Sequence, residues 1–339
     1  MSEISSRTVR APELYGDFWF NSEPLPIGAL RGKIILVDFW DYSSINCLRT
    51  IPYIKEWNRR YQSLGLVVIG VHSPQYPFGR DPENVHRAIG RIGIDYPVVM
   101  DNQQLIWGLY HNRFLPAKYL IDKDGFIRHV FVGEGGYVQL EHSIQTLLIE
   151  TGCYELLPLP MEPLRDTDKP DALCYRATPE LDAGYIHGSL GNLEGYAPES
   201  TVRYADPRYY IEGRFYLDGN WRSTRTAVRL ESEGGEQGSM IIPYTAAEVH
   251  VVVESEKSPS TIGITQDDLP LDESNIGSDV GFDAEHRSMM RIEEPRSYSV
   301  VRNRQFGQHR LRLESGSPQL VIHSISFISA VIPELIQNN

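Results

Sequence analysis

The chain has 339 residues, more than one domain usually contains, and its 41% hydrophobic and 10% aromatic content is enough for two cores. Its net charge of −13 argues against a nucleic acid or an anionic membrane as the main partner, since both attract Lys and Arg. No apolar run reaches the roughly 20 residues that cross a bilayer, and the opening segment lacks the pattern of a signal peptide. We therefore expect a cytoplasmic location, or a periplasmic or extracytoplasmic one if an export signal has been removed.

Strand and helix patterns alternate from residue 32 to about residue 149, as in an α/β domain. Apolar or periodic runs predict strands over 33–40, 66–72 and 97–100, and helices over 45–63, 83–92, 103–110 and 138–150. Pro52 should kink the first helix. Residues 117–121 and 127–132 flank an Asp-Gly turn and predict a β-hairpin. This order predicts a mixed sheet with helices on both faces.

The second half of the chain has a different pattern. Residues 155–180 contain five prolines and no sustained period, which is typical of a linker lying over a surface. Short alternating segments then predict strands over 209–216, 226–231, 239–243, 248–254, 261–265, 297–301, 309–314 and 320–328. We therefore expect a domain over 1–154, a linker over 155–178, and an all-β, jelly-roll-like sandwich over 179–339.

The segment 37–47 reads VDFWDYSSINC, which resembles the thioredoxin pattern V-D-F-W-x-x-x-C-x-x-C. Together with GLVVIGVHSP, DPENVHRAIGRIGIDYPVVMDN and PAKYLIDKDGFIRHVFVGEG, it makes the chain similar to TlpA-like redoxins of the DipZ type over about residues 12–150. Residues 180–330 more weakly resemble a carbohydrate-binding-like β-sandwich that follows the redoxin in some of these proteins. The resemblance implies a thioredoxin fold, and a thiol–disulfide oxidoreductase that acts on protein or low-molecular-weight thiols and disulfides.

The resemblance also implies a catalytic site where the first predicted helix begins. Ser44 stands where the family has its attacking cysteine, and Cys47 stands where it has the resolving cysteine. The free N–H groups and dipole of a helix N-terminus stabilise a thiolate. Asp38 matches a buried acid that takes up and returns protons during exchange. No cofactor or metal is implied, because sulfur itself carries the electrons.

Four further residues are expected at the substrate groove. Pro116 matches the cis-proline of thioredoxin folds, and with Leu115 it would orient an extended substrate chain. Trp40 and Tyr42 would border the groove, although their packing alone would also account for them. His72 ends a predicted strand and is read as a satisfied strand-end residue rather than a proton shuttle.

A serine at position 44 cannot form a disulfide with Cys47, so two-electron exchange within the chain is excluded as the sequence stands. Four readings stay open: a substituted oxidoreductase whose parent has cysteine there; a one-cysteine peroxidase resembling the T-x-x-C of peroxiredoxins; exchange with low-molecular-weight thiols at Cys47 alone; and a redox-inactive binding scaffold. Against the peroxidase, Trp40 replaces the proline of that pattern, and Arg49 should point away from Cys47.

The remaining candidates have mostly structural readings. Cys153 and Cys174 could pair, but two reduced, partly buried thiols are the simpler expectation. Aromatic residues of the second half could stack on sugar rings, although such residues more often fill a sandwich core: Tyr204, Tyr209, Tyr210, Tyr216, Trp221 and Tyr244. Acidic residues form a segment without calcium-loop spacing and are read as solvated: Asp267, Asp268, Asp272, Glu273 and Asp279. The second half could equally serve in dimerisation or protein docking.

Overall fold

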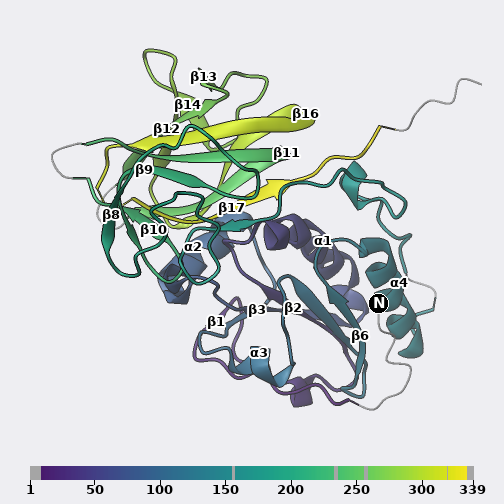
Figure 1. Cartoon of the computed structure of the whole chain (residues 1–339). Helices are drawn as coiled ribbons and strands as arrows, with labels where there is room; N and C mark the ends of the chain where they lie inside the picture. The colour runs from purple at the N-terminus through teal and green to yellow at the C-terminus, as the bar shows by residue number, and fades with distance from the viewer. Residues whose placement is uncertain (1–8, 155–156, 233–235, 256–258, 319, 334–339) are drawn as a thin grey trace, which may run out of the picture. The chain divides into compact units, whose positions relative to one another are not determined.

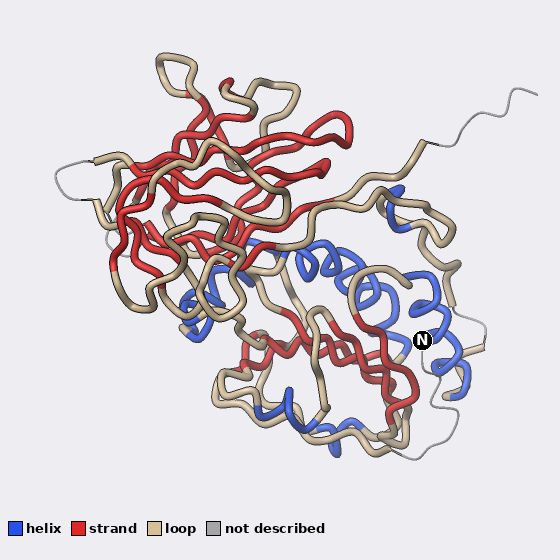
Figure 2. Tube along the Cα trace, in the orientation of Figure 1, coloured by secondary structure: helices blue, strands red, loops and turns tan. Residues whose placement is uncertain are grey.

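The computed structural model describes residues 9–154, 157–232, 236–255, 259–318 and 320–333. The first eight residues of the opening segment and the first two of the predicted linker therefore lie outside the described residues. The chain divides into two compact units, Met1–Asp171 and Ala172–Asn339. The described helices all belong to the first unit, whereas the described part of the second unit consists of strands and loops (Figure 2).

A six-stranded sheet in the order β1-β4-β3-β2-β5-β6 forms the first unit. Its strands are β1 Trp19–Phe20, β2 Ile34–Trp40, β3 Leu66–His72, β4 Val98–Met100, β5 Ala117–Ile121 and β6 Ile127–Val132. Strands β2, β3 and β4 are parallel, and the others run antiparallel to their neighbours. The helices are α1 Ile45–Tyr61, α2 Pro82–Ile92, α3 Leu105–Leu109 and α4 Tyr137–Glu150, with α1 and α4 on one side of the sheet and α3 on the other (Figure 1). The predicted mixed sheet with helices on both faces is confirmed.

Strand β2 lies inside the sheet, and all seven of its residues are buried. Such a strand has to be apolar on both faces, which explains why its sequence lacks alternation. Helix α1 follows after a four-residue turn and buries Ile51, Ile54 and Trp57. It continues through Pro52 as one helix. This strand–turn–helix unit fixes where residues 41–47 lie.

Two long strands dominate the second unit, β11 Gly238–Ser255 and β16 Arg296–Ser315. The others are β7 Leu181–Asp182, β8 Thr201–Tyr204, β9 Tyr216–Ser223, β10 Val228–Leu230, β12 Ser260–Gln266, β13 Leu269–Pro270, β14 Val280–Phe282, β15 Ser288–Ile292 and β17 Leu320–Ile328. Strands β9, β10, β17 and β11 pair in a closed ring, since β11 also pairs with β9. The unit is β-rich as predicted, but all its strands belong to one connected sheet with a barrel-like closure, and the predicted sandwich is not confirmed.

Several predicted strand bounds in this unit are wrong. The segments 239–243 and 248–254 belong to one strand, β11, and 297–301 and 309–314 belong to β16. Residues 302–310 are rich in polar side chains, so their sequence looks like a turn although their backbone pairs with β11. The predicted strand 209–216 is a loop until its last residue, where β9 begins.

The predicted linker is packed onto the first unit. We call residues 158–169 the strap. Its backbone is bonded by side chains of α1 and α4: Leu164 N–H donates to the Tyr53 hydroxyl (2.7 Å), Met161 N–H donates to Glu141 (2.9 Å), and Gln145 donates to the Pro158 carbonyl (2.8 Å). The described residues of the predicted linker, up to Asp171, are therefore part of the first unit.

The aromatic residues predicted for the second half are mainly core. Four of them are at most 3% exposed: Tyr204, Tyr216, Trp221 and Tyr244. Tyr209 is exposed, and Tyr210 donates a hydrogen bond to Asp206. The sugar-platform reading is therefore wrong for these four. The acidic segment is engaged in ion pairs at several points, including Asp279 with Arg296, and no group of three or more His, Cys, Asp or Glu in the described ranges could hold a metal.

Candidate thiol site at the start of α1

Ser44 and Cys47 lie at the start of α1, where the sequence predicts them. Ser44 is the N-cap residue, half-buried, and its side chain makes no capping bond to the helix backbone. Cys47 is 0% exposed. Burial raises the pKa of the Cys47 thiol far above its ordinary value; the Ser44 hydroxyl and the backbone at Asp41 lower it by less, and the carboxylates of Asp38 and Asp41 raise it further. As arranged, Cys47 is a protonated thiol that solvent does not reach.

Asp38 lies in β2, is 1% exposed, and its charge acts on the Cys47 thiol. Neither carboxylate oxygen has a hydrogen-bond partner among the described residues. Burial raises its pKa to about 7, opposed by the charge of Lys118, which stands opposite it on β5. A carboxyl group with a pKa near neutrality can both accept and return a proton, as the prediction for Asp38 requires.

Lys118 is itself buried, and its ammonium donates a 2.6 Å hydrogen bond to the Gly133 carbonyl. Burial lowers its pKa, while Asp38, Cys47 and Glu134 oppose the change. The phenol of Tyr96 completes this buried group: burial and the charges of Asp38, Asp95 and Cys47 raise its pKa well above the ordinary value. Sequence reasoning missed both residues. The antiparallel register of β5 against β2 would have placed Lys118 opposite Asp38.

The substrate groove differs in part from the prediction. The Leu115–Pro116 peptide bond is cis, and the Pro116 carbonyl accepts a hydrogen bond from Gly133 N–H (2.8 Å). Trp40 and Tyr42 are only 0% and 1% exposed, so they lie in the core and do not border a groove. Trp40 is buried because β2 is an interior strand of the sheet. Tyr42 is buried because the turn after β2 is bonded to the loop after β3.

His72 is fully buried at the end of β3, but neither ring nitrogen has a hydrogen-bond partner among the described residues, so the expectation of a satisfied strand-end residue is not confirmed. Its ring stacks on Tyr42 with centroids 5.4 Å apart and meets Trp40 edge-on at 5.3 Å. Its Nε2 atom lies 3.7 Å from the Asp41 carboxylate. Asp41 is a second buried acid that sequence reasoning did not single out.

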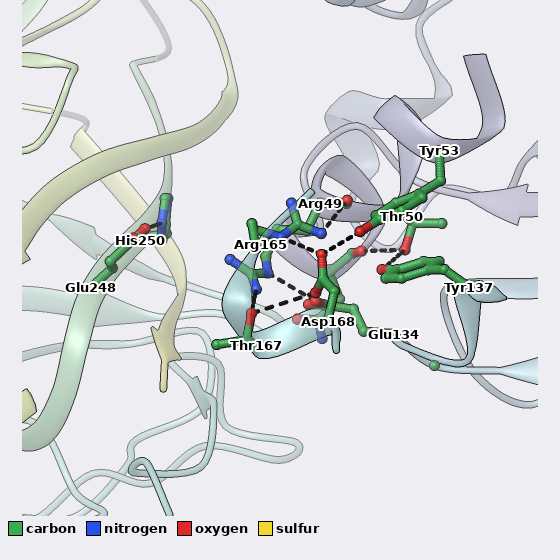
Figure 3. Close-up of polar contacts among 12 residues, drawn as sticks. Arg49, Thr50, Tyr53, Glu134, Tyr137, Arg165, Thr167, Asp168, Glu248 and His250 are labelled. Carbon is green, nitrogen blue, oxygen red and sulfur yellow. Dashed lines mark hydrogen bonds and ion pairs between the residues drawn. The ribbon is translucent and has the colours of Figure 1, made fainter. Parts of the chain in front are cut away.

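Arg49 connects the first turn of α1 to two other segments (Figure 3). Its guanidinium bonds Glu134, in the loop between β6 and α4, at 2.8 Å, and Thr167 of the strap at 3.2 Å. Asp168 of the strap accepts the Tyr53 hydroxyl at 2.7 Å and pairs with Arg165 at 2.9 Å. The guanidinium of Arg49 is therefore engaged by Glu134 and by the strap, and the strap is attached to the helix that carries the thiol.

The other two cysteines lie apart from this site. Cys153 is half-buried and bonds the Leu64 carbonyl, and Cys174 is exposed. Neither is in a disulfide. The prediction of partly buried thiols holds for Cys153 and is wrong for Cys174.

Comparisons with known proteins match both units. A model of the AhpC/TSA family matches residues 20–130, and a model of a thioredoxin-like C-terminal domain matches residues 178–327. Protein DipZ of Mycobacterium tuberculosis is 35% identical over 267 residues, which are 77% of this chain and 37% of DipZ. The chain therefore spans little more than a third of the length of this relative.

A shorter relative is matched almost throughout. Thiol-disulfide oxidoreductase YkuV of Bacillus subtilis is 30% identical over 141 residues, 41% of this chain and 95% of YkuV. Among solved structures, a thioredoxin-like protein in the oxidized form is 30% identical with a TM-score of 0.40, covering 42% of this chain and 97% of that one. No described helix is long and apolar enough to span a membrane. The comparisons support neither carbohydrate binding nor the cytoplasmic location.

Proposed function

Because the chain belongs to the thioredoxin-like redoxin family, we propose that its first unit works in thiol–disulfide exchange, with position 44 as the attacking position and Cys47 as the resolving thiol. With serine at position 44, the chain binds a disulfide substrate but does not complete the exchange reaction. Substrates are proteins or small molecules that carry a disulfide or a thiol.

The observation that carries this proposal is the difference in access between the two positions. Ser44 is half-buried at the open start of α1, where the backbone N–H groups and the helix dipole favour a negatively charged sulfur. Cys47 is 0% exposed, with a pKa raised by burial. A substrate can reach the first position and not the second, so an incoming disulfide needs sulfur at position 44.

With sulfur at position 44, the reaction balances as follows. The thiolate there attacks the substrate disulfide, forms a mixed disulfide and releases one substrate thiolate. Cys47 passes its proton to Asp38 and attacks the sulfur at position 44, which releases the second substrate thiol and leaves a 44–47 disulfide. The substrate gains two electrons and the site loses two. Two external thiols, or one external dithiol, then restore the site dithiol and leave as a disulfide.

The Ser44→Cys variant tests the proposal. Reduction of insulin disulfides by dithiothreitol should be catalysed at least about 100-fold faster than by the native chain, because only the variant can pass through the mixed disulfide. Ser43→Cys is the matched control: this neighbouring serine is 1% exposed, so sulfur there should not catalyse. Mass spectrometry should find a 44–47 disulfide in oxidised Ser44→Cys. An inactive Ser44→Cys variant without that disulfide would overturn the proposal.

A one-cysteine peroxidase is the second candidate, and one feature favours it: the Ser44 hydroxyl acts to lower the pKa of the Cys47 thiol, as the hydroxyl of a T-x-x-C pair would. The burial of Cys47 counts against it, because peroxide has to meet a thiolate. Treating the native chain with hydrogen peroxide and a sulfenic-acid probe separates the two functions. Rapid labelling of Cys47 would favour the peroxidase, and an unlabelled Cys47 would favour the exchange site.

A further inference from the structure

The turn between β2 and α1 is held by a buried carboxylate that the exchange mechanism does not use. Asp41 is 0% exposed. One of its oxygens accepts Ser43 N–H at 2.8 Å and the Ser43 hydroxyl at 2.9 Å, and the other accepts Gln75 N–H at 2.6 Å. Its own carbonyl accepts Ser44 N–H at 3.2 Å. The side chain thus clamps the turn that carries position 44 onto the loop that follows β3.

Asp41 remains charged in this environment. Burial alone would raise its pKa, but His72 and the N–H groups of Ser43 and Gln75 together hold the pKa below its ordinary value. A negative charge therefore lies next to the N-terminus of α1. This charge opposes a thiolate there, which the helix dipole alone would favour.

Charged and titratable groups around this turn come from four elements, and Tyr96, which precedes β4, acts on Asp38 and Cys47 as well. From β3 comes His72, with its Nε2 atom 3.7 Å from the carboxylate. Asp38 comes from β2, and Lys118 from β5. Cys47 comes from α1, and both Asp38 and Asp41 act against ionisation of its thiol. Two buried carboxylates thus oppose a thiolate at the start of this helix.

We propose that Asp41 is a positioning residue that keeps the thiolate fraction at position 44 low, so that exchange runs toward reduction of substrate disulfides. The inference rests on the proposed function. Strongly oxidising sites are those whose reduced form is stabilised as a thiolate. A site that disfavours the thiolate holds its own disulfide more firmly, and gives its electrons to a substrate disulfide when an external thiol has reduced it.

Two proteins whose site holds one thiol test the charge effect without requiring exchange activity, and mass spectrometry separates the label at position 44 from that at Cys153 and Cys174. The thiol pKa at position 44 is measured from the pH dependence of alkylation in Ser44→Cys/Cys47→Ser, with and without Asp41→Asn. Removing the charge should lower that pKa by about one unit and speed alkylation at pH 7 by about tenfold. An unchanged or higher pKa would overturn the inference, because a loosened turn alone predicts no decrease.

Two variants serve as references. Asp122→Asn removes a carboxylate with a similar structural task, since Asp122 is buried and accepts the N–H groups of Asp124 and Phe126 at 3.0 Å each. It lies at the opposite end of β5 from Pro116, so the thiol pKa at position 44 should not change. If Asp41→Asn does not fold, Asp41→Thr removes the charge and keeps a hydroxyl that can accept one of the backbone N–H groups.

The direction of exchange is measured in Ser44→Cys equilibrated with dithiothreitol at pH 8. Asp41→Asn should shift the equilibrium toward the reduced protein by about three- to tenfold. An equilibrium that stays where it was would overturn the claim about direction. A lowered thiol pKa in a protein that performs no exchange would support the role of Asp41 and overturn the proposed function, so the two failures are distinguishable.

Discussion

The two units differ in whether certain of their buried polar side chains have hydrogen-bond partners. In the second unit, the polar ends of the large buried aromatic side chains are bonded: Tyr204 donates to the Gly195 carbonyl, Trp221 to Asp218, and Tyr244 to Gln266. In the first unit, the carboxylate of Asp38 and the phenol of Tyr96 have no hydrogen-bond partner among the described residues.

A buried polar group without a partner costs about 1–3 kcal/mol, so a fold retains few of them without a reason. In the first unit Asp38 and Tyr96 are electrostatically coupled to each other and to Cys47. We propose that Asp38 and Tyr96 serve proton transfer, whereas the bonded aromatic side chains of the second unit stabilise its fold.

The largest expected effect tests the role of the buried aromatic side chains in the stability of the second unit. Trp221→Ala removes a side chain that is 1% exposed from the core of the second unit and should cost about 3–5 kcal/mol in its free energy of unfolding. Urea denaturation measures the loss. Tyr209→Ala, at a 74% exposed aromatic, should change stability by less than about 0.5 kcal/mol. A loss below about 1 kcal/mol for Trp221→Ala would show that this residue is not core.

The second prediction tests the buried carboxyl group of Asp38 through the pH dependence of stability. The pKa of Asp38 is raised to about 7 from 3.8, so its neutral form favours the fold. This contribution is fully present below pH 3.8 and is lost as the pH rises through about 7, a change of roughly 4 kcal/mol. Asp38→Asn should remove this part of the pH dependence. Urea unfolding at pH 5 and pH 8 gives the slope, and a variant with the native slope would contradict the assignment.

A matched pair of substitutions compares the units directly. Tyr244→Phe in the second unit loses bonds to Gln266 (2.8 Å) and Asn303 (3.3 Å) and should cost about 1–2 kcal/mol. Tyr96→Phe in the first unit removes a hydroxyl without a hydrogen-bond partner in the described ranges and should raise the free energy of unfolding, by up to about 1–3 kcal/mol. Thermal unfolding of both variants is the measurement. Equal losses would remove the distinction between the units.

The smallest effect concerns the strap. Thr167→Ala removes the bond to Arg49 (3.2 Å) and leaves the Arg49–Glu134 pair (2.8 Å) in place. We expect a loss of about 0.5–1 kcal/mol and faster proteolysis within residues 158–169. Thr146→Ala, on an exposed helical hydroxyl, is the control. Unchanged cleavage would mean that Thr167 does not hold the strap.

The sequence predicts the first unit well because its elements are local. Its strands are apolar runs, its helices are periodic, and the Asp-Gly turn marks the hairpin, so the bounds agree within about two residues. In the second unit, β11 and β16 exchange hydrogen bonds over most of their length, and this non-local pairing keeps polar residues 302–310 extended. Periodicity alone does not contain that information.

The site was predictable only where a motif covers it. The pattern around Ser44 and Cys47 places both at a helix start, which the structure confirms. Lys118 and Asp41 needed the strand register and the fold of the loop after β3, because their partners are distant in sequence. Trp40 was assigned to a groove because the motif does not tell which side chains face inward.

The most direct test of the central claim compares sulfur at the two positions. Alkylation by iodoacetamide at pH 8 is followed by mass spectrometry for Cys47 in the native chain, and for position 44 in Ser44→Cys/Cys47→Ser. We predict that the sulfur at position 44 reacts at least about 100-fold faster, because Cys47 is 0% exposed and its pKa is raised by burial. Equal rates, or a faster Cys47, would contradict the assignment of attacking and resolving positions.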